Sequence, residues 1–143
     1  QSRVDQVRPL PGARALLDAL TEAEIPWAVA TSGLLESAGP LLTKLQVDTD
    51  RVPVVTRDQV RHGKPDPDLF VAAAERLGVS VEDATVVGDA VWDMLAAQRA
   101  RALGIGLLSG GYGREELERA GAYRVYDDPR DLLDHLDEVG GRR

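Results

Sequence analysis

Cysteine is absent from this chain of 143 residues, and lysine occurs only twice. Without cysteine there is no disulfide framework, thiol nucleophile or thiolate zinc site, and a reducing compartment is the simplest setting. Positive charge is also scarce, since the formal net charge is −7 and the arginines are scattered rather than clustered. The sequence therefore lacks the basic footprint of a nucleic-acid-binding protein.

Long apolar runs are missing as well. No stretch approaches the roughly 20 apolar residues that span a bilayer, and no signal sequence opens the chain. We therefore expect a cytoplasmic protein that has neither a membrane nor a nucleic acid as its partner. With 43% hydrophobic and 29% charged residues, the composition is that of an ordinary globular domain.

Short apolar runs alternate with helical periodicities along the chain. Apolar residues at positions 13, 16, 17 and 20 predict a helix, and the next run, IPWAVATSG, breaks that period and predicts a buried strand. The other predicted strands cover 52–55, 84–88, 104–108 and 123–126, and the other predicted helices cover 34–46, 67–77, 91–102, 114–121 and 129–138. Such alternation builds βαβ units, which predicts an α/β fold with a parallel sheet, helices on both faces and ligands at the carboxyl ends of the strands.

Two aspartates follow the apolar strand in ATVVGDAVWDM. Asp89 lies at the end of the strand and Asp93 one helical turn later, so both carboxylates can face the same point. Two acids held together repel unless a cation compensates, and Mg²⁺ typically takes one or two carboxylates. The pair predicts a magnesium site, while the alternative is that Asp89 only caps the helix and Asp93 is solvated.

Thr31, Ser32 and Gly33 end another predicted strand, directly before a helix. A hydroxyl and free backbone N–H groups at such a place can hold a phosphate oxygen. Because Ser and Thr also cap helices, this stretch alone leaves a purely structural role open.

Lys64 stands out because the only other lysine in this arginine-rich chain is Lys44. That bias suggests a lysine retained where a compact, movable ammonium is needed. Gly63 and Pro65 constrain the loop around it, and Pro67 can begin the next helix. The alternative is an ordinary solvated lysine.

These three stretches together resemble the haloacid dehalogenase superfamily of phosphohydrolases, over nearly the whole chain. Thr31 in AVATSG fits the family's second motif, which hydrogen-bonds the transferring phosphoryl group, and Lys64 in GKPDPDLF fits the third, which steadies the nucleophile and the phosphoryl charge. Asp89 and Asp93 in VVGDAVWDM fit the fourth motif, which supplies carboxylate to Mg²⁺. The tail from residue 104 resembles phosphoglycolate phosphatase-like members and implies a Rossmann-like core.

The resemblance also implies parts that these residues lack. The family's first motif, an Asp-x-Asp after the first strand, is not found, so the nucleophile, the central strand and a helical cap are expected outside this chain. Residues 1–8 then resemble the end of the cap or its hinge, and residues 9–143 a partial core. If the polypeptide truly starts at Gln1, we expect it to be inactive alone and to self-associate through unpaired strand edges.

For the intact protein, the resemblance implies Mg²⁺-dependent hydrolysis of a small phosphorylated metabolite through an aspartyl-phosphate intermediate. The implied roles are catalysis by Thr31, Lys64 and Asp89, phosphate binding by Thr31, Ser32, Gly33 and Lys64, and metal binding by Asp89 and Asp93. Two alternatives stay open, a non-catalytic phosphate-binding or regulatory domain and a phosphosugar mutase of the same superfamily. We expect His62 to be a solvated loop histidine, the alternative being contact with substrate, and the glycines of the stretch 109–113 to permit a turn, the alternative being a position at the site entrance. We give His135 and Trp92 no role in the chemistry.

Overall fold

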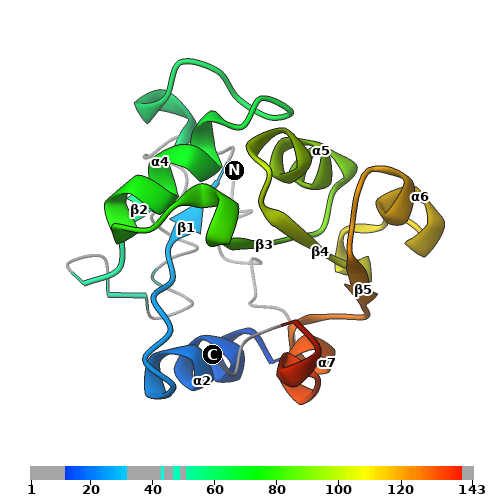
Figure 1. Ribbon diagram of the computed structural model, residues 1–143. Helices are drawn as coiled ribbons and strands as arrows, with labels where there is room; N and C mark the ends of the chain where they lie inside the picture. The colour runs from blue at the N-terminus through cyan, green and yellow to red at the C-terminus, as the bar shows by residue number, and fades with distance from the viewer. Residues whose placement is uncertain (1–11, 32–42, 44–46, 49–50, 140–143) are drawn as a thin grey trace, which may run out of the picture.

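The computed structural model describes residues 12–31, 43, 47–48 and 51–139 (Figure 1). The helices are α2 (Ala13–Glu22), α4 (Asp68–Leu77), α5 (Val91–Ala100), α6 (Arg114–Arg119) and α7 (Pro129–Asp134). The strands are β1 (Val29–Ala30), β2 (Val54–Val55), β3 (Thr85–Gly88), β4 (Leu103–Leu107) and β5 (Arg124–Tyr126). Short 3-10 turns are η1 (Arg57–Gln59), η2 (Val81–Asp83), η3 (Leu108–Gly110) and η4 (Leu136–Val139).

All strand pairs in the described residues are parallel, which confirms the predicted α/β class. β1 pairs with β2, with Val29 opposite Val54, and β3, β4 and β5 follow one another in a second set, with Val86 opposite Gly104. The sequence predicted one sheet, but no described hydrogen bond joins the two sets. Among the described strands, β1 and β3 are therefore each paired along one edge.

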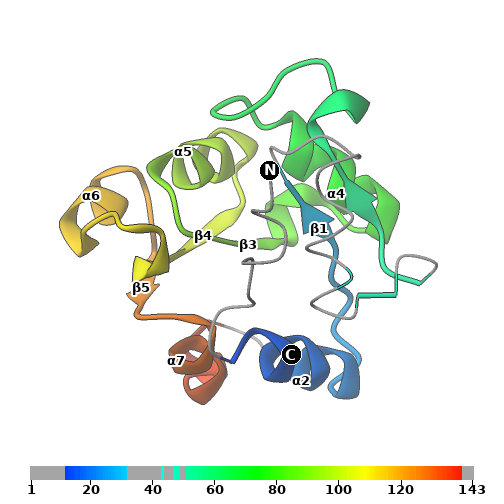
Figure 2. The same cartoon turned by 180° about the vertical axis from the view of Figure 1, so that it is seen from behind.

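Helices cover both faces of the strands, as predicted, and Figures 1 and 2 show α2 and α7 on the face opposite α4 and α5. On the first face, Leu16 of α2 packs in one buried cluster with Ile105 of β4 and Leu132 of α7. The apolar period of α2 predicted this inward position of Leu16.

The opposite face has two buried clusters. One joins Phe70 of α4 to Val86 of β3 and to Ala96 and Ala97 of α5. The other joins Met94 of α5 to Leu117 of α6 and Val125 of β5. α5 contributes to both clusters, because small and apolar residues occupy more than one side of it. Helices therefore pack against both faces of the strands, and this packing holds the carboxyl ends of the strands in place.

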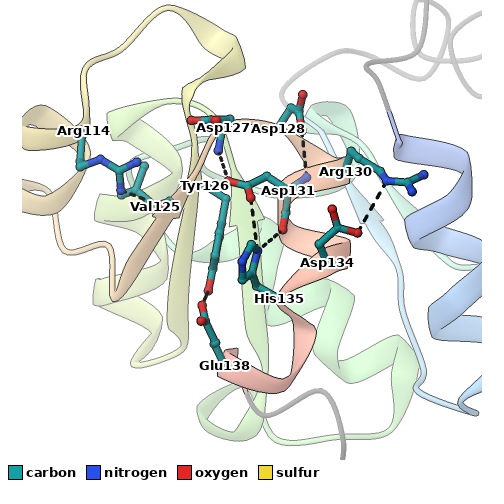
Figure 3. A network of polar contacts seen from close by, with 10 residues as sticks. All are labelled: Arg114, Val125, Tyr126, Asp127, Asp128, Arg130, Asp131, Asp134, His135 and Glu138. Carbon is teal, nitrogen blue, oxygen red and sulfur yellow. Dashed lines mark hydrogen bonds and ion pairs between the residues drawn. The ribbon is translucent and has the colours of Figure 1, made fainter.

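The predicted boundaries are correct for α4, which ends at Gly78 in the left-handed conformation with φ 74°. The predicted helix 129–138 is wrong in its last turn, because α7 ends at Asp134 and the chain continues as η4. At the break, Nδ1 of His135 bonds the carbonyl of Asp131 at 2.8 Å, and the His135 amide donates to Leu132 at 2.9 Å (Figure 3). These local bonds replace the pattern that would continue the helix.

Other predicted ends are shifted. α5 stops at Ala100 because Arg101 adopts φ 64°, and α6 stops at Arg119 rather than at residue 121. The predicted strand 25–33 reduces to Val29–Ala30 in its described part. The predicted hinge, residues 1–8, and the predicted helix 34–46, except for residue 43, fall outside the described residues. None of the helices in the described part of the chain is long and apolar enough to cross a membrane.

Candidate active site

A pocket of about 270 Å³ lies where the carboxyl ends of β1, β3 and β4 meet. The residues that line it are Ala30, Thr31, Lys64, Phe70, Val87, Gly88, Asp89, Asp93 and Leu107. Thr31, Lys64 and Asp89 therefore meet at the carboxyl edge of the strands, where the α/β pattern predicted that ligands bind. Asp93 is brought to the same pocket, although these four residues are spread over more than 60 positions of the chain.

Lys64 and Asp93 form an ion pair inside the pocket. The Lys64 Nζ donates to Oδ1 of Asp93, and the two side chains are only 14% and 9% exposed. A pair so sheltered from water keeps more of its attraction than a surface pair. The ammonium is thus held at a defined place in the pocket.

An aromatic ring lies on another side of the same ammonium. The Nζ of Lys64 is 5.7 Å from the centroid of the Phe70 ring, and Phe70 is buried in the first turn of α4. This distance is within the range of a cation–π contact. The sequence analysis missed Phe70, although it is the only phenylalanine in the chain and lies in the same motif as Lys64.

The loop that carries Lys64 is fixed to the two helices beside it. The amide of His62 donates to Oδ2 of Asp68 at 2.9 Å, and Arg99 of α5 reaches Asp66 at 3.3 Å. His62 itself is exposed and is not among the residues that line the pocket.

Both oxygens of the Asp93 carboxylate have partners within the domain. Oδ1 accepts from Lys64, and Oδ2 accepts from the amide of Ala90 at 3.2 Å, at the start of α5. Only 7% of the residue is exposed. These contacts make Asp93 a group that orients Lys64 and closes the first turn of α5.

Asp89 differs from Asp93 in this respect. Among the described residues its carboxylate has no hydrogen bond or ion pair, although it lines the pocket and is half-buried. The described residues also include no cluster of three or more acidic or histidine side chains that could hold a metal. One open carboxylate is what a Mg²⁺ ion that keeps several waters can use, so the donors present fit the predicted cation.

Thr31 lies at the end of β1. Its amide donates to the carbonyl of Val55 at 3.0 Å, which continues the β1–β2 pairing to the edge of the pocket. Ser32 and Gly33, which the sequence predicted to bind phosphate, lie outside the described residues.

Comparison with known proteins adds independent information. Residues 2–101 match the model of a family described as haloacid dehalogenase-like hydrolase. A phosphoglycolate phosphatase from Rhodospirillum rubrum is 36% identical over 135 residues, which are 93% of this chain and 56% of that protein. The chain spans about half the length of the curated relatives it matches.

Two solved structures extend the likeness to three dimensions. The crystal structure of a hydrolase from Pseudomonas syringae has a TM-score of 0.92 and 54% identity, covering 95% of this chain and 63% of that one. A putative beta-phosphoglucomutase from Thermotoga maritima has a TM-score of 0.81 and 32% identity, covering 90% of this chain and 60% of that one.

Proposed function

Since the chain belongs to the haloacid dehalogenase-like hydrolase family, we propose that the full-length protein hydrolyses a small phosphorylated metabolite in the cytoplasm. The observation that carries this proposal is the meeting of Thr31, Lys64 and Asp89 in one pocket. The relatives named as phosphatases support the hydrolase reaction over a non-catalytic phosphate-binding domain.

Each residue of the pocket has a different role in binding a phosphoryl group. Lys64 stabilises the negative charge on the oxygens, and Thr31 hydrogen-bonds one of them. Asp93 holds Lys64 in position through the ion pair in the pocket. A bound Mg²⁺ would offset phosphate charge, and Asp89 would hold it with Asp93 close by.

We further propose covalent catalysis through an aspartyl phosphate. The attacking carboxylate is expected from a segment other than residues 1–143. In the described part of the pocket, Asp93 is committed to Lys64 and Ala90, and Asp89 is the carboxylate left for the cation. Attack on phosphorus would break the P–O bond to the alcohol of the substrate, which leaves with a proton. Water would then hydrolyse the aspartyl phosphate, releasing inorganic phosphate and restoring the carboxylate.

The test is Asp89→Asn in the full-length protein, assayed with a generic phosphate ester over a range of Mg²⁺. Turnover should fall by about 100-fold or more, because the amide offers the cation a weaker ligand without charge. Asp83→Asn is the matched control, since Asp83 is exposed on η2 and does not line the pocket, and it should keep full activity. Undiminished turnover in excess chelator would refute the metal assignment.

The likeness to a putative beta-phosphoglucomutase favours one second candidate, a phosphosugar mutase. The two activities differ in their products, because a phosphatase releases inorganic phosphate and a mutase returns a phosphosugar isomer. Measuring both products from the same phosphosugar separates them. Release of phosphate in step with substrate loss supports the phosphatase.

A further inference from the structure

The turn after β4 lies directly against Asp89. It comprises η3, Leu108–Gly110, and the following Gly111. The turn is anchored at its start, because Leu107 is buried at the pocket and Leu108 packs against the cluster around Met94. The amide of Gly111 closes it by donating to the carbonyl of Leu108 at 3.2 Å.

The backbone of Gly110 leaves no room for a side chain. A Cβ atom on Gly110 would lie 2.7 Å from Cγ and 2.8 Å from Cβ of Asp89, and it would also press on the main-chain oxygen of that residue. Since one of these contacts is to backbone, rotating the Asp89 side chain would not relieve it. Gly110 does not have a positive φ, so any residue could adopt its backbone conformation. Glycine is needed at position 110 because Asp89 lies too close for a side chain.

Gly111 is the opposite case. Its φ is +93°, in the region that favours glycine, and a Cβ there would meet nothing within 4 Å. Two adjacent glycines of one turn are therefore required for different reasons, and only Gly110 acts on the pocket.

We propose that Gly110 is a positioning residue for Asp89, whose close backbone sets where the carboxylate enters the pocket. The inference rests on the proposed function, in which Asp89 holds Mg²⁺. In the described residues the carboxylate has no hydrogen bond to orient it, so packing against the backbone of Gly110 is left to constrain its position from this side. A displacement of about 1 Å in such a group can cost a large part of its effect.

The experiment compares Gly110→Ala with Gly111→Ala in the full-length protein. Binding of MgCl₂ is measured by calorimetry without substrate, and thermal unfolding is recorded in parallel. Gly110→Ala should weaken Mg²⁺ binding by about 10-fold to 100-fold, as loss of a group that supports a metal ligand does, and should also lower the unfolding temperature, because the added Cβ must displace the main chain of Asp89. Gly111→Ala should lower the unfolding temperature and leave Mg²⁺ affinity within about twofold, because it strains the backbone without touching Asp89.

Three results would overturn the inference: an unchanged Mg²⁺ affinity in Gly110→Ala, an equal loss in both variants, or a Gly110→Ala protein that does not fold. Asp89→Asn distinguishes failure of the proposed function. If Asp89→Asn has the same Mg²⁺ affinity as the wild-type protein, Asp89 is not a metal ligand. The metal assignment then fails together with the inference.

Discussion

At the scale of single residues, Phe70 is the contact that the sequence motif did not reveal. Replacing it by leucine keeps an apolar side chain but removes the ring beside Lys64. We expect Phe70→Leu to lower turnover by about 2-fold to 30-fold, since a cation–π contact contributes roughly 0.5–2 kcal/mol and 1.4 kcal/mol corresponds to about tenfold in rate. The ring-current shift on the Lys64 side chain should disappear in NMR spectra of residues 1–143 prepared with labelled lysine, in which only Lys44 and Lys64 contribute.

Phe70→Tyr is the control, because it keeps a ring at the same place. It should preserve most of the shift and of the activity. An unchanged Lys64 resonance in Phe70→Leu would show that the ring does not act on the ammonium.

His135 makes the stability of the C-terminal region depend on pH. Its pKa is raised above the ordinary value of 6.5, mainly by the hydrogen bond to the Asp131 carbonyl and further by the charges of Glu138, Asp131 and Asp134 (Figure 3). The ring also stacks on Tyr126, with the centroids 5.7 Å apart. A raised folded pKa means that the stabilisation is complete below the unfolded pKa and is lost as pH rises through the folded one.

We therefore expect His135→Gln to have a lower unfolding temperature than the wild-type protein, and we expect this difference to be larger at about pH 5.5 than at about pH 8.5. Thermal scans at both pH values measure this difference. Within residues 1–143, a His62→Gln background leaves His135 as the only histidine, so its titration can be followed directly by NMR of this part of the chain. A titration midpoint at or below 6.5 would contradict the raised pKa.

The residues of the site could be predicted to different degrees from the sequence. Thr31, Lys64, Asp89 and Asp93 were found because each follows a strand or lies in a constrained loop. Phe70 was missed because a buried aromatic side chain has the same pattern whether or not it also contacts an ammonium. Gly110 was taken for a residue that only permits a turn, because its contact with Asp89 joins segments that are about 20 positions apart and leaves no local signal.

At the scale of elements, the end of α4 depends on Gly78, the residue that follows the helix. Gly78 has φ 74° and ψ 26°, its amide donates to the carbonyl of Glu75 at 3.1 Å, and a Cβ there would meet nothing within 4 Å. Gly78→Ala should lower the free energy of unfolding by about 1 kcal/mol, because the cost is conformational only. Urea unfolding measures it.

Gly78→Asn is the matched control, since asparagine tolerates the left-handed region better than alanine. It should lose less stability than Gly78→Ala, and both variants should keep the pocket intact. Equal losses in the two variants would contradict a purely conformational cost.

The order of helices and strands was predictable, because alternating apolar runs and helical periods are local signals. The break at His135 was not, since it depends on hydrogen bonds and stacking with residues whose meeting the periodicity does not encode. The separation of the strands into two described sets likewise depends on pairing between distant segments. Only the resemblance, which implies a central strand outside this chain, indicated this separation.

At the scale of the whole molecule, residues 1–143 expressed alone should show no phosphatase turnover and should associate in solution. β1 and β3 each pair along one edge among the described strands, and unpaired backbone N–H and C=O groups favour pairing with another chain. Light scattering after size separation measures the mass, with the full-length protein as the control in both assays. A stable monomer with full activity would contradict the missing-strand and missing-nucleophile predictions together.

The ion pair between Lys64 and Asp93 also sets the charge balance of the pocket. Of the charged side chains that line it in the described residues, Lys64 and Asp93 compensate each other, so Asp89 leaves a formal excess of one negative charge. A phosphate dianion approaching this surface is repelled, whereas a divalent cation is attracted and reverses the sign. If the site holds Mg²⁺ as proposed, we expect the cation to bind first and the phosphate second, so that chelation would act on substrate capture as well as on the chemical step.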